Sequence, residues 1–251
     1  MPNRTLKCGV TIYFKGLPLE MGPLPAFLYF SLSGPDSLSL EPYNLPVTNM
    51  EGDNIRIFSI SLPYHDDYDK REVVSMWAHE IQDGKDFITP FIESAQQAID
   101  ELIEEDVIDP DHLAVGGLSR GSFIATHLAA REPRIKALVG FAPLTQLKVS
   151  TSFKELHNAP LLEQLSIFRL KEQLKNTAIR YYIGNRDTMV QTTACYEFVR
   201  ELTDFVYDSG TRSPQVELIL SPSIGYKGHG TSQEKFEDGA HWIKTQLGLN
   251  L

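Results

Sequence analysis

A short buried strand passes into a helix through one tight turn in the stretch LAVGGLSRG, residues 113–121. Residues 113–117 are apolar or glycine, which is typical of a strand covered on both faces. A helical pattern occupies residues 123–131 and ends near Pro133. The turn has the form G-x-S-x-G and centres on Ser119. Its serine hydroxyl is therefore expected above the edge of a sheet, at the start of a helix.

The glycines of this turn have a steric reason. A side chain at Gly117 or Gly121 would strike the neighbouring strand or helix. The helix that follows also points its first N–H groups toward any oxygen held at Ser119. A purely structural turn between strand and helix is the alternative interpretation.

Strands alternate with helices on both sides of this turn, which predicts an α/β fold. The pattern favours a doubly wound, mostly parallel sheet with helices on both faces. We predict strands over residues 6–14, 26–32, 54–62, 135–141, 177–183 and 216–220. We predict further helices over residues 87–104 and 232–247.

The chain shows no linker or repeat, so residues 1–251 are expected to form one domain. One segment, residues 145–176, lies between two predicted strands and carries apolar periodicity over 161–174. This segment is either a crossover helix with a long lead-in loop or a small cap over the site.

Composition narrows the classes of function. Hydrophobic residues make up 42% of the 251 residues, and the formal net charge is −10. An acidic surface repels nucleic acid and anionic lipid, so neither is an expected partner. Cys8 and Cys195 are too few for a disulfide framework, and no apolar stretch reaches the ~20 residues of a membrane span. With no recognisable secretory signal, we expect a cytoplasmic protein that does not enter a membrane; its oligomeric state stays open.

A serine nucleophile needs a base, and the base needs a group that orients it. Asp187 follows the strand predicted over residues 177–183. His229 lies between two glycines in the loop after the strand predicted over 216–220. The order serine, acid, histidine at the ends of parallel strands makes Ser119, Asp187 and His229 the candidate catalytic triad.

The rival residues fit less well. His65 precedes Ser119 and is expected in a polar loop with Asp66 and Asp67. Asp204 and Asp208 lie within or after the helix that follows Asp187. The other histidines lie in predicted helices, in the turn before residue 113 or in the possible cap: His79, His127, His241, His112 and His157.

An oxyanion formed at Ser119 needs two N–H donors. The first is expected to be the backbone amide of Arg120, directly after the nucleophile. The second is expected in the loop after the strand of residues 26–32, from Ser33 or Gly34, because Pro35 has no amide hydrogen. The Arg120 side chain either pairs with an acidic surface group or binds a substrate carboxylate.

The chain resembles the α/β-hydrolase superfamily, in particular its small serine esterases near the dienelactone hydrolase and prolyl oligopeptidase branches. Residues 109–143 carry the resemblance best, and it continues through residues 184–190 and 228–230. It implies an α/β-hydrolase fold with a minimal cap or none, and a triad of Ser119, Asp187 and His229. That superfamily includes esterases, thioesterases, peptidases and inactive members.

We expect hydrolysis of a small carboxylic ester through an acyl-enzyme, without a metal or an organic cofactor. A thioesterase or acyltransferase using the same triad, and a catalytically silent binding protein, are the alternatives. If residues 161–170 pack as a crossover helix, residues 143–145 and 33–40 would wall a short acyl pocket. Acetyl to butyryl esters would then be preferred over octanoyl esters.

Overall fold

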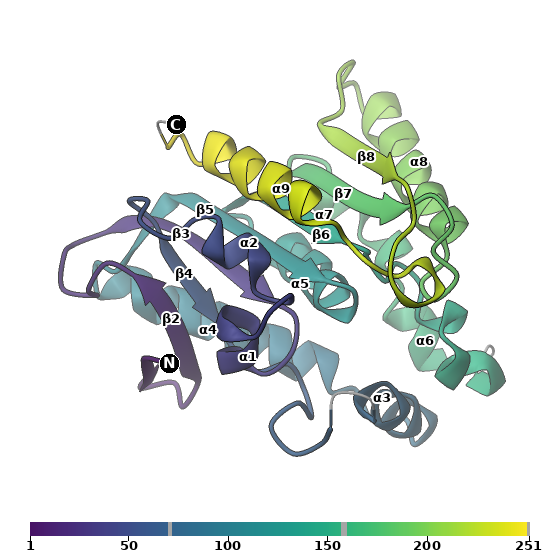
Figure 1. Cartoon of the computed structure of the whole chain (residues 1–251), viewed down its shortest axis with the longest axis horizontal. Coiled ribbons are helices and arrows are strands. Elements are labelled where there is room, and N and C mark those ends of the chain that lie inside the picture. Colours follow the sequence, from purple (N-terminus) through teal and green to yellow (C-terminus); the bar gives the residue numbers. More distant parts are fainter. Residues whose placement is uncertain (70–71, 157–159, 250–251) are drawn as a thin grey trace.

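The computed structural model describes residues 1–69, 72–156 and 160–249 and contains an eight-stranded sheet. Its strands are β1 (Asn3–Thr5), β2 (Thr11–Gly16), β3 (Leu24–Phe30), β4 (Arg56–Ser59), β5 (Ile108–Leu118), β6 (Ile135–Phe141), β7 (Ala178–Gly184) and β8 (Val216–Ser221). The order across the sheet is β1-β2-β4-β3-β5-β6-β7-β8. The β1–β2 and β2–β4 pairs are antiparallel and every other pair is parallel. The mostly parallel sheet predicted from the sequence is confirmed (Figure 1).

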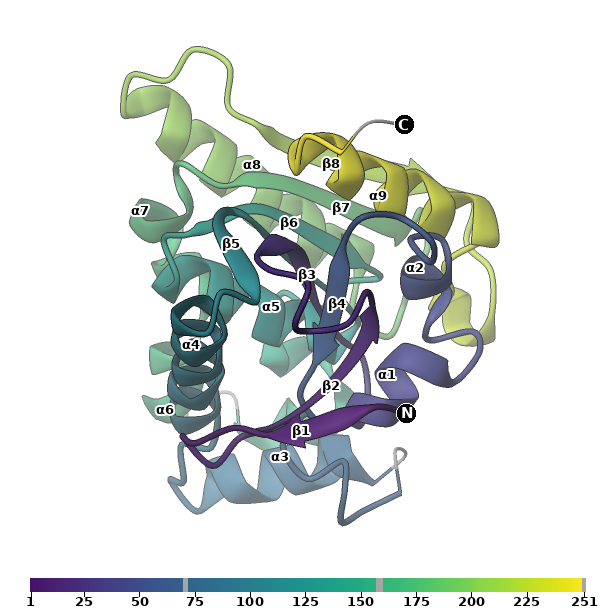
Figure 2. The same cartoon turned by 90° about the vertical axis from the view of Figure 1, so that its left-hand side faces the viewer.

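Helices cover both faces of the sheet, as Figure 2 shows. One face packs α1 (Gly34–Ser39), α2 (Leu45–Thr48) and α9 (Gln233–Gln246). The other packs α3 (Val73–Gln82), α4 (Ile88–Glu104), α5 (Arg120–Arg131) and α8 (Thr192–Asp208). Among the described residues, no helix combines the length and the hydrophobicity needed to cross a bilayer.

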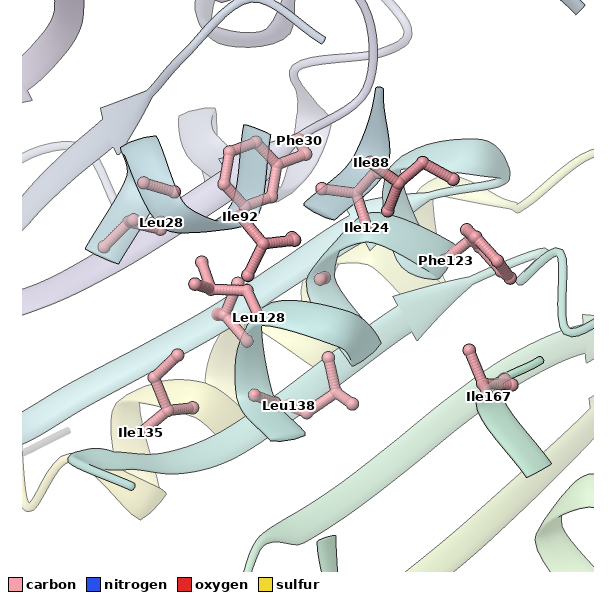
Figure 3. Packing of buried hydrophobic residues seen from close by; sticks show 14 of the residues in the cluster. Leu28, Phe30, Ile88, Ile92, Phe123, Ile124, Leu128, Ile135, Leu138 and Ile167 are labelled. Atoms are coloured by element: carbon pink, nitrogen blue, oxygen red, sulfur yellow. The ribbon is translucent and has the colours of Figure 1, made fainter. Parts of the chain in front are cut away.

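Each face has its own apolar core, because the strands between them are buried on both sides. The core on the α4 and α5 face is drawn in Figure 3, where side chains of β3, α4 and α5 meet. Its members include Leu28, Ile92, Ile124 and Leu128. This packing holds α5, and with it the turn at Ser119, against the middle of the sheet.

The strand predicted over residues 6–14 is wrong in its first part, because residues 6–10 form the turn between β1 and β2 and only residues 11–14 belong to a strand. The amide of Gly9 donates to the Leu6 carbonyl, and Gly9 has a φ of 86°, a conformation that favours glycine. The Glu101 carboxylate of α4 accepts the amides of Lys7 and Cys8 at 2.7 and 2.9 Å. The turn therefore depends on a carboxylate far along the chain.

Two boundaries near the central turn also differ from expectation. Strand β5 starts at Ile108 and includes Asp109, Pro110 and Asp111, so it begins five residues before the buried strand predicted from Leu113. Its pairing with β3 shifts register there, because Ile108 pairs with Leu24 and Leu113 pairs with Ala26, so the extra residues of β5 form an irregularity against β3. Helix α5 begins at Arg120, directly after Ser119.

Residues 145–176 do not form one crossover helix. The described part is divided into η1 (Leu147–Val149), η2 (Thr151–Leu156), α6 (Pro160–Gln164), η3 (Ile167–Arg169) and α7 (Lys171–Leu174). Residues 157–159, and with them His157, lie outside the described residues. Element η2 packs against α3, while α7 packs against α5 and α8. Figure 1 shows α3 and α6 beyond the ends at which the parallel strands finish.

Candidate active site

Ser119 occupies a strained turn between β5 and α5. Its φ of 55° and ψ of −116° are rare for a residue with a side chain. Two backbone hydrogen bonds hold the turn: the Ser119 amide donates to Phe141 O at 2.8 Å, and the Leu144 amide donates to Ser119 O at 3.1 Å. A Cβ on Gly117 would lie 2.3 Å from the carbonyl carbon of Gly121, which explains why the turn needs glycine there.

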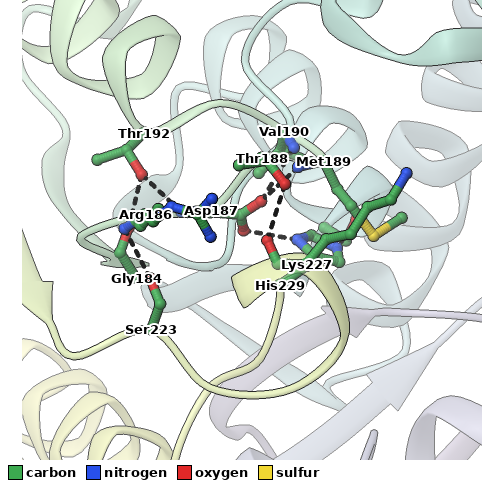
Figure 4. A network of polar contacts seen from close by, with 11 residues as sticks. Gly184, Arg186, Asp187, Thr188, Met189, Val190, Thr192, Ser223, Lys227 and His229 are labelled. Carbon is green, nitrogen blue, oxygen red and sulfur yellow. Dashed lines mark hydrogen bonds and ion pairs between the residues drawn. The ribbon is translucent and has the colours of Figure 1, made fainter.

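Asp187 lies in the turn after β7, with its side chain fully buried. Its Oδ1 accepts the amides of Met189 and Val190 at 2.9 and 3.1 Å (Figure 4). Thr192 Oγ1 accepts the Asp187 amide at 3.0 Å and so fixes the turn. These contacts leave Oδ2 facing the histidine.

His229 follows η4 (Tyr226–Gly228), and two contacts hold its loop against the acid turn: both the amide and Oγ1 of Thr188 donate to Lys227 O at 3.0 Å. His229 Nδ1 lies 2.7 Å from Asp187 Oδ2, and His229 Nε2 lies 3.0 Å from Ser119 Oγ. Because a carboxylate only accepts, Nδ1 carries the hydrogen and Nε2 is left to accept the proton of the serine hydroxyl.

The structure thus brings together the three residues that the sequence selected. The rivals lie elsewhere. Asp204 and Asp208 are exposed on α8, and His112 Nδ1 pairs with Asp109 Oδ2 at 2.8 Å near the start of β5.

The loop after β3 lies beside the start of α5, where an oxyanion donor is needed. The amides of Ser31 and Leu32 both donate to Ser37 Oγ at 3.0 Å. The amide of Gly34 donates to Ser61 Oγ at 2.8 Å. Within the part of the chain that the structure describes, the Ser33 amide has no acceptor. Of the two backbone donors expected from the sequence, the Ser33 amide is therefore the one that can donate to an oxyanion.

His65 lies in the loop with Asp66 and Asp67, as expected, but its side chain is buried. Its Nδ1 lies 3.1 Å from Pro63 O, so Nδ1 donates. Burial, together with the positive charge of Arg120, lowers the pKa of His65 to about 4. Burial likewise lowers the pKa of Arg120 to about 10, and the Arg120 side chain is only partly exposed. The electrostatic effect of Arg120 on His65 joins residues far apart in the sequence and has no local signal there.

A pocket of about 370 Å³ lies between α5, α8 and the segment that follows β6, and Ser119, Asp187 and His229 are not on its lining. Phe123 and Thr145 line it on one side, and Leu162 and Phe168 line it from the broken segment between β6 and β7. The crossover helix that would have buried the apolar residues of 161–170 does not form, and Leu162 and Phe168 remain partly exposed. Their periodicity indicated burial, but it did not show that the helix is divided.

Comparison with known proteins points to one fold. No family model matches the chain. The human acylamino-acid-releasing enzyme is 24% identical over 184 residues, a match that spans 62% of this chain and only 24% of that enzyme.

Solved structures give the same fold. A Thermus thermophilus protein covers 100% of both chains with a TM-score of 0.69 at 17% identity. A puromycin-hydrolyzing peptidase of Mycobacterium tuberculosis matches 99% of this chain and 40% of its own, with a TM-score of 0.65 at 18% identity. The chain therefore has the α/β-hydrolase fold, as the resemblance over residues 109–143, 184–190 and 228–230 predicted.

Proposed function

We propose that this protein is a serine hydrolase that cleaves a small carboxylic ester through an acyl-enzyme. The observation that carries the proposal is the position of His229, whose two ring nitrogens lie 3.0 Å from Ser119 Oγ and 2.7 Å from Asp187 Oδ2. Nucleophile, base and orienting acid in this geometry are what acyl transfer requires.

The reaction follows from these contacts. His229 Nε2 accepts the proton of Ser119 as Oγ attacks the ester carbonyl. The tetrahedral intermediate collapses, and His229 returns the proton to the leaving alcohol. Water then attacks the acyl-serine with the same assistance and releases the acid. Buried Asp187 stabilises the imidazolium in both steps.

The oxyanion of each intermediate is assigned to the amides of Arg120 and Ser33. The first belongs to the residue after the nucleophile, at the start of α5, where the helix dipole also favours negative charge. The second is the amide left over in the loop after β3, while Gly34 is committed to Ser61. Fixed backbone donors need no rearrangement as charge develops.

A fluorophosphonate probe tests the nucleophile. We expect the wild type to be labelled and to hydrolyse 4-nitrophenyl esters, and Ser119→Ala to lose both while staying folded by circular dichroism. Ser209→Ala, which changes an exposed serine after α8, is the matched control and should behave as the wild type. Labelling that persists in folded Ser119→Ala would exclude Ser119. A wild type that is neither labelled nor active would favour a catalytically silent binding protein.

A second candidate is hydrolysis of an acylated amino acid or peptide. It is favoured by the match to the acylamino-acid-releasing enzyme, although the chain spans 24% of that protein. An N-acetylalanine anilide and the matching ester distinguish the two, since the same triad serves both leaving groups. If a thioester acylates Ser119 as fast as the ester does, thioesterase or acyl-transfer activity becomes a third candidate.

A further inference from the structure

We propose that Ser37 is a positioning residue for the oxyanion site. Its hydroxyl oxygen holds the amides of the two residues before Ser33, and this leaves the Ser33 amide directed toward the oxyanion. The proposal rests on the function proposed above. It adds to that function a buried side chain that acts on the reaction through a backbone donor.

The loop after β3 leaves the sheet beside the first turn of α5. Phe30, the last residue of β3, pairs with Gly117 of β5. A Cβ built on Gly121 would lie 3.1 Å from the amide nitrogen of Ser31. The loop that starts at Ser31 therefore contacts the helix that begins directly after Ser119. A change in the path of this loop changes where its amides lie relative to the nucleophile.

The amides of this loop have acceptors on both sides of Ser33. The amides of the two residues before Ser33 both donate to Ser37 Oγ at 3.0 Å. The amide of the next residue, Gly34, donates to Ser61 Oγ at 2.8 Å. Among the residues described, the Ser33 amide is the one of these four without an acceptor. Two serine hydroxyls therefore determine which amide of the loop can donate to an oxyanion.

The first turn of α1 brings Ser37 back to the loop. Its amide donates to Ser33 O at 2.8 Å. Helical side chains tilt toward the N-terminus of their helix, so the Ser37 hydroxyl points to the residues that precede α1. Ser37 has no exposed surface and both of the hydrogen bonds that it accepts are buried, so solvent does not compete for them. Because buried amides without an acceptor are costly, the loop should move when this oxygen is removed.

Hydrolysis of 4-nitrophenyl acetate tests the effect on the reaction. Ser37→Ala should lower kcat by about tenfold or more and change KM by less than about twofold, because an oxyanion donor acts mainly in the transition state. Ser39→Ala is the matched control. Ser39 lies on the same helix, and its exposed hydroxyl donates to Pro35 O at 2.8 Å. This variant should keep both values of the wild type.

A pair of ketones separates this role from a general disturbance of the site. In a trifluoromethyl ketone, Ser119 Oγ bonds to the carbonyl carbon, the π electron pair passes to the carbonyl oxygen, and the serine proton passes to His229 Nε2. The resulting oxyanion resembles that of the proposed intermediate, whereas the matching methyl ketone stays trigonal. We expect Ser37→Ala to weaken binding of the trifluoromethyl ketone by about the factor lost in kcat/KM, and to leave the methyl ketone unchanged. Fluorine NMR should show a higher pKa for the adduct oxygen in this variant.

The outcomes distinguish this proposal from the proposed function. Wild-type kcat and wild-type affinity for the trifluoromethyl ketone in folded Ser37→Ala would overturn the role of Ser37 and leave the esterase function intact. An equal loss for both ketones would also overturn it. If Ser37→Ala does not fold, Ser37→Cys takes its place, because sulfur is a weak acceptor, and the same outcomes apply. A wild type that neither cleaves the ester nor forms the adduct would reject the proposed function.

Hydrogen exchange measured by NMR decides the two hydrogen bonds separately from turnover. The amides of Ser31 and Leu32 should exchange slowly in the wild type, because both donate to a buried acceptor. Ser37→Ala should speed the exchange of both by roughly fivefold or more, the value of one hydrogen bond. Ser39→Ala should keep the rates of the wild type. Unchanged exchange in Ser37→Ala would show that other contacts fix the loop, and would overturn the proposal.

Discussion

The carbonyl oxygen of Phe30 occupies the space that a side chain on Gly121 would need: a Cβ built on Gly121 would lie 2.0 Å from it. Phe30 ends β3, and Gly121 is the second residue of α5. This contact holds the end of β3 against the first turn of α5, the helix that follows the adjacent strand β5. The oxyanion loop starts directly after Phe30, so this contact also sets the distance from that loop to Ser119.

We therefore predict that Gly121→Ala lowers the free energy of unfolding by about 1–3 kcal/mol, the usual cost of overpacking. The ester hydrolysis rate should fall further than the folded fraction does, because either the loop or the helix must move. Urea denaturation and kcat, measured where the variant is fully folded, check both effects. Wild-type values for both would show that α5 and β3 are not in contact.

Asp187→Asn should retain the fold and lose about 10⁴-fold in kcat. Asp187 Oδ1 accepts two backbone amides, so the oxygen of an asparagine would take that side and its NH₂ would face His229 Nδ1. Nδ1 would then have to accept, and Nε2 would carry the hydrogen and could not take the proton of Ser119.

The matched control for this change is Asp208→Asn, at the exposed end of α8. Its kcat should equal that of the wild type. A large loss of kcat in Asp208→Asn, with little loss in Asp187→Asn, would show that Asp187 is not the acid that orients His229.

The sequence was sufficient for the parts of the site that follow an apolar strand. Ser119, Asp187 and His229 each lie in a loop after a strand of a parallel sheet, and such loops gather at one edge. Local pattern and chain order were therefore enough to select them.

Features that depend on distant partners could not be predicted in this way. The β1–β2 turn is held by Glu101 from α4, and the choice of Ser33 over Gly34 depends on Ser61. The pocket depends on how the segment after β6 is divided into short helices, which apolar periodicity alone does not show. Ser37, which accepts two amides of the oxyanion loop, also gave no signal that distinguishes it from other serines.

Ser61→Ala should reduce kcat by about tenfold, with a smaller effect on KM. Ser61 Oγ accepts the amide of Gly34 at 2.8 Å and donates to Asp66 Oδ1 at 2.7 Å, so it ties the oxyanion loop to the loop after β4. Without these two hydrogen bonds the Ser33 amide is held less firmly in position. Complete loss of one oxyanion donor lowers kcat by about 10²–10³-fold, so a displaced donor should cost less than that. Ser61→Thr keeps the hydroxyl and should recover most of the activity. Equal kcat in Ser61→Ala and wild type would show that the loop is positioned without this contact.

Stability should fall as the pH drops below the ordinary histidine range, and His127 is one cause. Burial lowers the pKa of His127 to about 4, and its Nε2 lies 3.0 Å from Leu165 O, so the neutral ring donates there. Between about pH 6.5 and 4 the unfolded chain binds a proton that the folded chain does not, so the free energy of unfolding decreases as pH falls. The whole shift corresponds to about 3 kcal/mol.

His127→Gln keeps an N–H donor and removes the titration. Urea denaturation at two pH values, one above and one below this window, should therefore show a smaller decrease for this variant than for the wild type. His241→Gln, at an exposed position of α9, should keep the decrease of the wild type. An unchanged decrease in His127→Gln would mean that the ring is protonated in the folded protein.

The length of the acyl group tests whether the acyl chain enters the pocket of about 370 Å³ that Phe123, Thr145 and Leu162 line. Each methylene that enters an apolar pocket contributes about 0.8 kcal/mol, up to roughly fourfold in kcat/KM. We therefore expect kcat/KM to rise from acetyl to hexanoyl 4-nitrophenyl esters, beyond the acetyl-to-butyryl preference that a short pocket would give. Leu162→Trp places a larger side chain on the lining and should lower the hexanoyl-to-acetyl ratio, whereas Gln164→Trp, exposed on the same helix α6 and off the lining, should keep it. A ratio that is low in the wild type and insensitive to Leu162→Trp would mean that the acyl chain does not enter this pocket.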